Sequence, residues 1–276
     1  MLKLFDTHTH FDVEDFDHDR LALAKKAYHS GVQALILIGI VAPRFKDLLA
    51  TQQFLSKHKD VPTSYLAPGL HPFYIEQHQA KHLDELEHLL QSHPCVAIGE
   101  IGLDSFLAIH KTASIKQQQS TFFSRQLDMA KQYDKPVLLH IRKSHAETLQ
   151  LLKKHHFNNG GIAHAFSGGV EEAKALVKLG FKIGVTGQVT NPHAKRLHQV
   201  IRALSVDDLV LETDCPDMTP LCCQIPGESK TRNTPANLPY VLDGLAQLLS
   251  LDKEKLAEKT WNNSLQCLNM TKNKTS

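Results

Sequence analysis

Short apolar runs alternate with helix-like segments along the whole chain, and this alternation most constrains the fold. The runs predict eight strands, at 3–8, 33–39, 63–69, 95–100, 136–140, 160–164, 181–186 and 208–213. The segments between and after them predict helices near 17–30, 43–58, 80–92, 115–133, 144–155, 169–179, 192–203, 236–250 and 252–268. Continuous apolar strands that alternate with helices indicate an α/β protein with a parallel sheet buried on both faces.

Eight strand–helix pairs favour a closed (β/α)8 barrel of the TIM type over an open doubly wound sheet. An open sheet would need a glycine-rich phosphate-binding turn after the first strand, where this chain has Asp6-Thr7-His8-Thr9-His10. The length of 276 residues is close to the roughly 250 residues of one such barrel. We therefore expect a single barrel domain over residues 1–270, followed by a C-terminal tail over 271–276.

Charge and hydropathy exclude several classes of partner. The net charge of +2 argues against an extended basic surface for long nucleic acids, but it is compatible with a small phosphate ester or a nucleic-acid end. No apolar run reaches 18 residues, so we expect no membrane partner. The five cysteines form no CxxC pair, which favours free thiols in a reducing, cytoplasmic compartment. Nothing in the sequence indicates an obligate protein partner.

Histidines are numerous, and only some of them are candidates for chemistry. Most of the 18 lie on polar segments, and we expect His78, His82, His88 and His93 to be solvated surface residues. The candidates stand instead where predicted strands end. Because the C-terminal ends of barrel strands converge on one mouth, residues far apart in the chain would meet there. Four histidines and two carboxylates are enough ligands for two metal ions, and they are His8, His10, Glu100, His140, His164 and Asp214.

His8 and His10 are two positions apart, so on a strand both side chains face the same side. Neutral imidazole suits Zn, Mn or Fe better than Mg. The alternative is a polar first loop without a metal, but Asp6 before this pair and Asp214 near the other end of the chain favour the metal site. Asp214 could share that metal and also accept the proton of the attacking water. Glu212 lies deeper on the same face and is expected to be structural.

Glu100 is the candidate for a bridge between two metals. A carboxylate can bridge cations about 3.5–4 Å apart, and no lysine ends any of the central strands to do so instead. The alternative is a carboxylate held by an arginine or lysine at a strand end. Asp104, four residues later, could orient a neighbouring ligand.

His140 and His164 end consecutive strands and together supply what a second metal needs, although either alone could be a core histidine. Arg142 is two residues beyond His140 and faces the same side, where a guanidinium suits a phosphate oxygen. A surface salt bridge is the alternative for Arg142. The role of Cys215 is left open, because its thiol could bind a softer metal, become oxidised or simply pack in the core.

Seven motifs follow one another in the order Asp6-Thr-His-Thr-His10, Gly69-Leu-His-Pro72, Gly99-Glu-Ile-Gly-Leu-Asp104, His140-Ile-Arg142, His164-Ala-Phe-Ser-Gly168, Glu212-Thr-Asp214 and Arg232-Asn-Thr-Pro235. With them the chain resembles, over nearly its whole length, the TatD family of metal-dependent deoxyribonucleases among the amidohydrolase-like barrels. The resemblance implies a TIM-type barrel and a two-metal site, with metal roles for the six residues named above. It also implies that His71 and Arg142 contact the substrate phosphate.

Two positions depart from the family pattern. Ser105 stands before Phe106, where the family often has an aromatic directly after Gly-Leu-Asp, so stacking of that aromatic on a base would differ here. Cys215 stands where many members carry alanine, which leaves the metal preference open.

The favoured function is hydrolysis of DNA phosphodiesters, at ends or in single strands, by two divalent metals such as Zn, Mn or Mg, with Asp214 and Glu100 as catalytic residues. The same ligands would serve an ester or amide hydrolase, such as one acting on the aminoacyl ester of a D-aminoacyl-tRNA. A third hypothesis is a barrel that binds but does no chemistry, and the intact set of six ligands argues against it.

Overall fold

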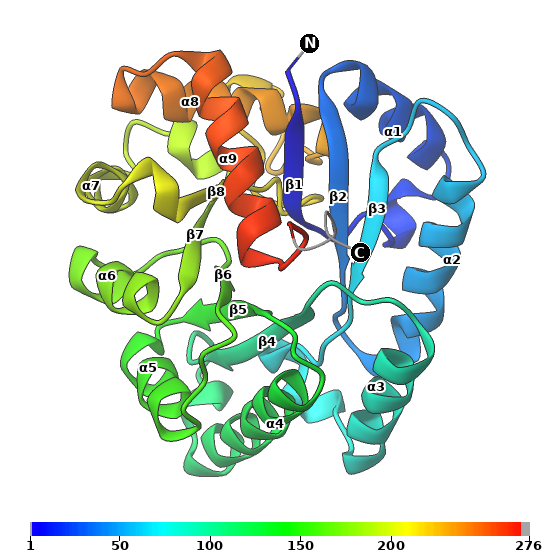
Figure 1. Cartoon of the computed structure of the whole chain (residues 1–276), viewed down its shortest axis with the longest axis vertical. Helices are drawn as coiled ribbons and strands as arrows, with labels where there is room; N and C mark the ends of the chain where they lie inside the picture. Colours follow the sequence, from blue (N-terminus) through cyan, green and yellow to red (C-terminus); the bar gives the residue numbers. More distant parts are fainter. Residues whose placement is uncertain (1, 272–276) are drawn as a thin grey trace.

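The computed structural model describes residues 2–271, and it has the predicted barrel architecture (Figure 1). Parallel pairing joins the strands that are neighbours in sequence within two sheets, one of β1 to β3 and one of β4 to β8. The strands are β1 (Leu4–Thr9), β2 (Val32–Ile38), β3 (Thr63–Ala67), β4 (Ile98–Asp104), β5 (Val137–Arg142), β6 (Gly161–Ala163), β7 (Phe181–Val185) and β8 (Leu209–Leu211).

Helices surround these strands, as the alternating pattern predicts. They are α1 (Arg20–His29), α2 (Phe45–Ser56), α3 (Ala80–Ser92), α4 (Ala113–Gln132), α5 (His145–Lys154), α6 (Val170–Lys178), α7 (Lys195–Ala203), α8 (Leu238–Leu249) and α9 (Lys253–Cys267). The last helix lies across one end of the barrel, in front in Figure 1. Asn263 in α9 donates hydrogen bonds to the carbonyls of Val206 and Leu209, at the start of β8. This helix therefore covers the N-terminal ends of the strands.

The fourth strand is shifted from its predicted position. The sequence predicts it at 95–100, but Cys95 only forms an isolated bridge with Leu66, and β4 runs on to Asp104. The ladder continues because Asp104 is in register with Arg142 of β5. Glu100 therefore lies inside a strand rather than at its end. The predicted tail lies outside the described residues from residue 272 onward.

The seam between β3 and β4 joins the two sheets by backbone hydrogen bonds outside regular strand pairing. Val96 donates to the carbonyl of Leu66 at 2.9 Å, and Gly99 donates to the carbonyl of Pro68 at 3.0 Å. The backbones approach so closely here that a Cβ on Gly69 would lie 2.6 Å from the carbonyl carbon of Gly99. Two glycines thus allow the chain to carry the following residue, Glu100, to the barrel mouth.

The seam between β1 and β8 is closed largely by side chains. Asp6 is fully buried and accepts two hydrogen bonds from Thr213, from the backbone N–H at 2.8 Å and from the hydroxyl at 2.6 Å. Just beyond, the N–H of Asp214 donates to the carbonyl of His8 at 2.9 Å. Together the two seams close the barrel, and the (β/α)8 prediction is confirmed.

Apolar side chains fill the barrel interior, so it is a packed core and not a pore. Alternate residues of β2, namely Ala34, Ile36 and Ile38, belong to this inner cluster, while Leu35 and Leu37 pack outward against the helices. The open mouth at the C-terminal ends of the strands is therefore the place where polar groups gather.

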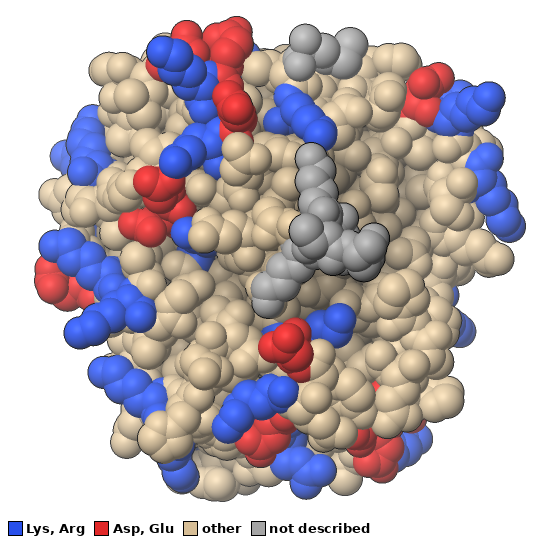
Figure 2. All heavy atoms as spheres, in the orientation of Figure 1, with Lys and Arg blue, Asp and Glu red and all other residues tan. Residues whose placement is uncertain are grey.

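The surface carries charges of both signs. On the face shown in Figure 2, lysine and arginine side chains alternate with acidic ones and form no continuous patch of one sign. Within residues 2–271, no helix combines the length and the apolar character that crossing a membrane requires.

Two of the four histidines predicted at the surface are buried, so the prediction is wrong for them. His78 and His82 are each 5 % exposed, whereas His88 and His93 are exposed as expected. His78 bonds through Nε2 to the carbonyl of His71 at 2.9 Å, and the ring of His82 accepts the N–H that caps α3 at 3.2 Å. Because their neighbours in sequence are polar, the sequence does not reveal that both rings form hydrogen bonds to buried backbone groups.

Candidate metal centre

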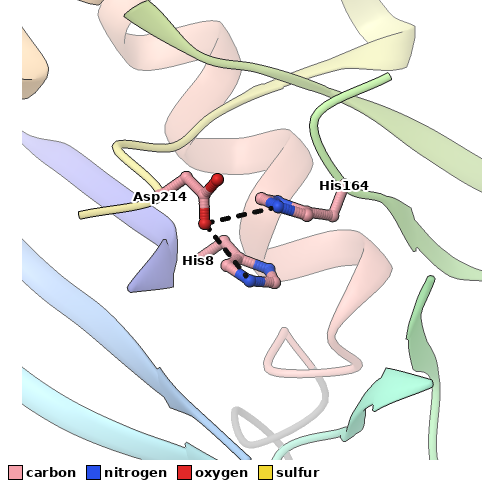
Figure 3. A group of neighbouring side chains, drawn as sticks. All are labelled: His8, His164 and Asp214. Atoms are coloured by element: carbon pink, nitrogen blue, oxygen red, sulfur yellow. Dashed lines mark ion pairs between the residues drawn. The ribbon is translucent and has the colours of Figure 1, made fainter. Parts of the chain in front are cut away.

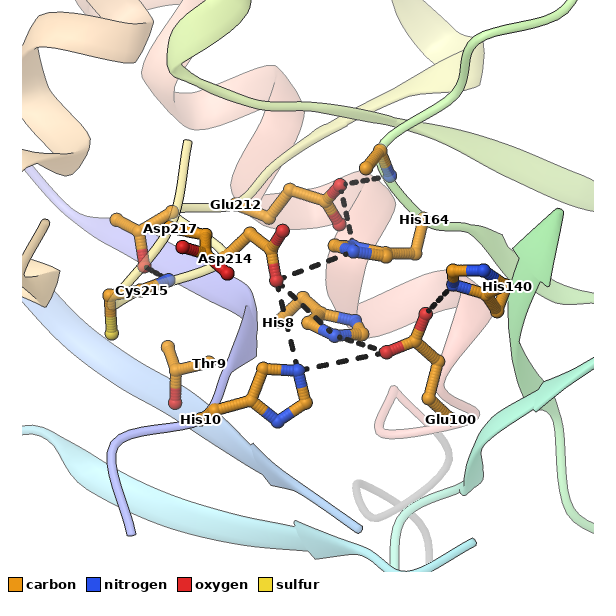
Figure 4. Close-up of polar contacts among 12 residues, drawn as sticks. His8, Thr9, His10, Glu100, His140, His164, Glu212, Asp214, Cys215 and Asp217 are labelled. Carbon is orange, nitrogen blue, oxygen red and sulfur yellow. Dashed lines mark hydrogen bonds and ion pairs between the residues drawn. The ribbon is translucent and has the colours of Figure 1, made fainter. Parts of the chain in front are cut away.

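The structure brings the predicted ligands together at the mouth of the barrel (Figure 4). Three overlapping groups have ligand atoms within 4.8 Å of one another and could hold a metal ion. They are His8, His164 and Asp214; His8, His10 and Glu100; and His71, Glu100 and His140. His71, which the family resemblance links to substrate phosphate, is thus also within reach of a metal.

Glu100 lies at the centre of the cluster with a side chain only 2 % exposed. Its Oε2 is 3.2 Å from Nε2 of both His8 and His71, and its Oε1 is 2.7 Å from Nδ1 of His140. Burial alone would raise the pKa of this carboxyl, but the surrounding imidazoles hold it well below its usual range. Within residues 2–271, no lysine or arginine pairs with Glu100, which excludes the alternative of a simple strand-end salt bridge.

Asp214 enters the cluster from the loop that follows β8 (Figure 3). Its backbone is in the left-handed region, with φ 56°, which aspartate tolerates better than most residues. Its Oδ1 lies 3.4 Å from Nε2 of His164 and 3.8 Å from Nε2 of both His8 and His10. One carboxylate oxygen therefore faces three imidazoles that come from two strands.

His8 and His10 have buried ring nitrogens that lack hydrogen-bond partners. Nδ1 of both rings is unpartnered among the described residues, and so is Nε2 of His8. Burial and the nearby His164, which stacks on His8 with ring centroids 3.4 Å apart, lower the pKa of His8. A neutral, unpartnered imidazole nitrogen in a buried site costs free energy unless a ligand such as a cation binds it.

The spacing of the donor atoms is close to that around a bound cation. Ligand atoms about 2.1 Å from a common ion lie about 3–3.5 Å from one another. His8 Nε2 lies 3.2 Å from Glu100 Oε2, within this range, while its 3.8 Å separation from Asp214 Oδ1 and the 3.7 Å separation of His10 Nε2 from Glu100 Oε2 are slightly wider. Most of these separations exceed a normal hydrogen bond. The donor set of imidazoles and carboxylates therefore suits Zn, Mn or Fe, and it suits Mg less well.

His140 and His164 each have a further carboxylate on the side of the ring that faces away from Glu100 or Asp214. Asp104 Oδ2 is 2.8 Å from Nε2 of His140, and Glu212 Oε1 is 3.0 Å from Nδ1 of His164. Although burial opposes protonation, Glu100 and Asp104 raise the pKa of His140 to about 9. Glu212 and Asp214 similarly raise the pKa of His164 well above its ordinary value. Such outer partners fix the orientation of metal-binding imidazoles.

The two predicted substrate-binding residues have different surroundings. His71 is buried, and this burial lowers its pKa to about 4, so its ring is neutral at pH 7. Arg142 is exposed, and its guanidinium carbon lies 3.5 Å from the ring centroid of Phe106. Among the described residues, no acidic side chain pairs with Arg142, so the surface salt bridge considered for it is absent.

Cys215 is fully buried beside the cluster but belongs to none of the three groups. Burial raises the pKa of its thiol well above the ordinary value, and its sulfur points away from the imidazoles in Figure 4. Its carbonyl accepts a hydrogen bond from the N–H of His10 at 2.9 Å. Of the possibilities left open for this thiol, the structure favours packing.

Sequence reasoning missed two residues that support the site. His110 holds Asp104 through a 3.1 Å contact to Oδ1, but it lies in a short 3-10 helix, Ile109–Lys111, without any periodic signal. Thr213 holds Asp6, and its place between Glu212 and Asp214 gave a weak hint that it shares their region. Partners of this kind depend on which chain segments lie side by side, and that is a tertiary property.

Comparison with known proteins places the chain in a family. A family model described as TatD related DNase matches residues 5–269. An uncharacterized metal-dependent hydrolase of Escherichia coli K12, YjjV, is 34 % identical over 270 residues, which cover 97 % of this chain and 98 % of that protein. The 3'-5' ssDNA/RNA exonuclease TatD of Escherichia fergusonii is 30 % identical over 259 residues, covering 93 % and 95 %.

The fold agrees with these matches. The crystal structure of the YjjV protein superposes with a TM-score of 0.85 at 35 % identity and covers 96 % of this chain and 98 % of its own. The similarity thus extends from the motifs at the strand ends to the arrangement of the whole barrel. The chain belongs to the TatD family of metal-dependent hydrolases.

Proposed function

We propose that this protein hydrolyses phosphodiester bonds of DNA, at strand ends or in single strands, with two divalent cations. The observation that carries the proposal is the position of Glu100, whose two oxygens face histidines on opposite sides of the cluster. A carboxylate in this position can bridge two cations. The relatives named as 3'-5' ssDNA/RNA exonucleases support a nucleic-acid substrate.

The ligands divide between two ions around Glu100. We assign one ion to His8, His10, Asp214 and Glu100, and the other to Glu100, His140 and His164. The assignment of His164 follows the family resemblance, because in the structure its ligand atoms group with those of His8 and Asp214. His71 and Arg142 would bind the substrate phosphate, as a neutral imidazole and an exposed guanidinium can. Because His71 also lies within ligand distance of Glu100, metal binding by His71 is the competing assignment.

Asp214 has the properties of the proton acceptor. Although burial opposes ionisation, the surrounding imidazoles hold the pKa of Asp214 below its usual range, so its carboxylate is ionised at neutral pH. As water attacks phosphorus, Asp214 takes its proton, and the bond from phosphorus to the leaving sugar oxygen breaks. When bound, the cations would lower the pKa of water and share the charge that develops on the phosphate. Arg142 would stabilise a non-bridging phosphate oxygen.

The burial of the site favours strand ends and single strands. Side chains of the cluster are between 1 % and 17 % exposed, so a phosphate must enter the mouth to reach them. An unpaired strand can bend into such a mouth, while the backbone of an intact duplex would have to be distorted. The native cation and a cytoplasmic location stay predictions.

The test is a cleavage assay with added Mg, Mn or Zn. We expect cleavage of end-labelled single strands, weaker cleavage of blunt duplexes and none of relaxed, covalently closed duplex circles. The Glu100→Gln variant and chelator-treated protein are the controls. Cleavage of closed circles as fast as single strands would contradict the end preference. Turnover of an aminoacyl ester, with no cleavage of any DNA, would replace the phosphodiester by an acyl substrate.

A further inference from the structure

Two cations share one aromatic ring beside the metal centre. The guanidinium carbon of Arg142 lies 3.5 Å from the ring centroid of Phe106, and Nζ of Lys143 lies 5.0 Å from it. Phe106 is 40 % exposed, in the loop between β4 and α4. Arg142 and Lys143 are consecutive residues at the end of β5, the strand that also carries His140. The arrangement therefore joins the ends of two neighbouring strands.

Both cations lack an anionic partner. In residues 2–271, neither Arg142 nor Lys143 has an acidic side chain within ion-pair distance, whereas Arg20, Arg44 and Arg232 are each paired. Two neighbouring positive charges repel each other, and the face of an aromatic ring offsets part of that repulsion. An incoming phosphate would offset it further.

Asp104 fixes this pair of cations relative to the metal centre. Its Oδ1 accepts the N–H of Phe106 at 2.7 Å, while its Oδ2 is 2.8 Å from Nε2 of His140. The N–H of Ser105 donates to the carbonyl of Arg142 at 2.9 Å. Since two residues of a strand span about 6.7 Å, Arg142 lies beside the metal ligands and not among them.

We propose that Phe106 is a positioning residue that holds Arg142 and Lys143 as a phosphate subsite next to the metal centre. In this subsite Arg142 contacts the phosphate that is cleaved, as proposed above, and Lys143 binds a second phosphate, adjacent to it in a single-stranded nucleic acid. This inference rests on the proposed function and narrows it, because it selects strands with more than one phosphate over a single phosphodiester.

The contact between Arg142 and Phe106 distinguishes the positioning role of Phe106 from base stacking. A guanidinium 3.5 Å from the ring centroid is in van der Waals contact with one ring face, so a base cannot stack on that face. The exposed ring would contribute by aiming the cations, and its effect on binding would depend on phosphate charge. A base-stacking platform would depend on the bases instead.

The first experiment measures binding of a fluorescent, phosphorothioate-linked single strand to the metal-loaded protein by anisotropy at several salt concentrations. Phe106→Leu keeps an apolar side chain, and we expect about two- to fivefold weaker binding from the lost cation–π contact. For Lys143→Gln we expect the slope of log affinity against log salt to fall by about 0.7. Lys153→Ala on the exposed side of α5 is the matched control, with unchanged affinity and slope.

The second probe is an abasic strand of the same length and charge. We expect Phe106→Leu to weaken its binding by the same factor as that of the strand with bases. A loss confined to the strand with bases would overturn the phosphate subsite in favour of base stacking. Wild-type affinity and salt slope in both variants would also overturn it.

Turnover distinguishes failure of the subsite from failure of the proposed function. Phe106→Leu should raise KM for an oligonucleotide two- to fivefold more than for a dinucleoside monophosphate, which has one phosphate. Strand cleavage with identical KM ratios in the variant and the wild type would overturn the subsite and leave the nuclease function. Strand binding that depends on Phe106 and Lys143, without cleavage of any strand, would support the subsite and contradict the nuclease function.

Discussion

The histidines at the end of β1 meet His140 of β5 at Glu100 and His164, after β6, at Asp214, but the protein supports these histidines differently. His140 and His164 each face a second carboxylate on the outer side of the ring. His8 and His10 have no such partner among the described residues, and their Nδ1 atoms are buried without a hydrogen bond. Nδ1 of His164 lies 3.0 Å from Glu212 but also without a hydrogen bond, whereas His140 is hydrogen-bonded at both ring nitrogens. The support by the protein is therefore strongest at His140 and weakest at His8 and His10.

Protonation also differs among the histidines of the centre. Although burial opposes protonation, Glu100 and Asp104 raise the pKa of His140 to about 9, so in the metal-free protein this ring carries a proton at pH 7. Burial lowers the pKa of His8, so that ring is neutral, whereas Glu100 and Asp214 raise the pKa of His10 against the effect of burial. Cations can bind only the deprotonated form of a ring nitrogen. A cation thus meets a ready ligand in His8 and must displace the proton of His140.

The largest expected effect comes from the residue that both sides share. Glu100→Gln removes a charge that faces His8 and His140 at once, so binding of both cations should suffer. We expect turnover at saturating metal to fall by more than the roughly 10- to 100-fold typical of losing an outer partner. Arg142→Ala removes one charged hydrogen bond, worth about 1.5–3 kcal/mol. Metal content and kcat of both variants check this order, and near-normal turnover of the glutamine variant would disprove the bridge.

Loss of an outer carboxylate should reduce metal affinity and activity less than loss of Glu100. The effect should be confined to the side of the centre on which that carboxylate lies. Asp104→Asn and Glu212→Gln should each lower metal affinity or activity by about 10- to 100-fold. The matched control is Asp128→Asn, which breaks an exposed His–Asp pair between Asp128 and His155. Neither residue belongs to the metal centre. Isothermal titration with Zn or Mn gives the affinities. Equal losses in all three variants would show that Asp104 and Glu212 have no specific role in metal binding.

Strand ends could be predicted because their signal is local. An apolar run followed by histidine or carboxylate indicates both a strand and its polar end, and the barrel then brings such ends together. Exact positions were harder to predict, because β4 runs on to Asp104 and its pairing with β5 has a register shift between Gly99 and Ile101. Such a shift depends on the neighbouring strand.

The supporting contacts could not be predicted for a similar reason. His78 looked like a surface residue because its neighbours are polar, but it binds the carbonyl of His71 in the folded chain. Asp104 could be named as a possible orienting residue, whereas its partner His110 could not. Each contact joins segments whose proximity follows from packing, and packing is not periodic in the sequence.

Metal binding should release the proton that His140 carries in the metal-free protein. Because the pKa of His140 is about 9 without metal, its proton must leave, and apparent affinity should rise up to about tenfold per pH unit from pH 6 to about 9. The protonated ring stabilises the metal-free fold fully below pH 6.5, and this contribution disappears as pH rises through 9. Titration calorimetry in buffers of different ionisation enthalpy counts the protons. In Asp104→Asn the rise should end at lower pH, and an unchanged profile would contradict the role of Asp104.

The smallest effect concerns the seam that positions the β1 side. Thr213 is fully buried, and its hydroxyl donates to Asp6 at 2.6 Å, so Thr213→Val leaves a buried carboxyl oxygen without that bond. We expect the free energy of unfolding to fall by about 1–3 kcal/mol. Urea denaturation of the metal-free protein measures it, which keeps the result independent of cation binding.

Thr148 in α5 provides a matched control for this substitution. It is as deeply buried as Thr213, but its hydroxyl has no hydrogen-bond partner among residues 2–271. Thr148→Val should therefore leave stability unchanged or raise it, since it removes a buried polar group without breaking a bond. If the seam positions His8 and Asp214, Thr213→Val should also weaken metal binding while Thr148→Val does not. Equal stability of the two variants would mean that the hydroxyl of Thr213 contributes nothing to holding β1 against β8.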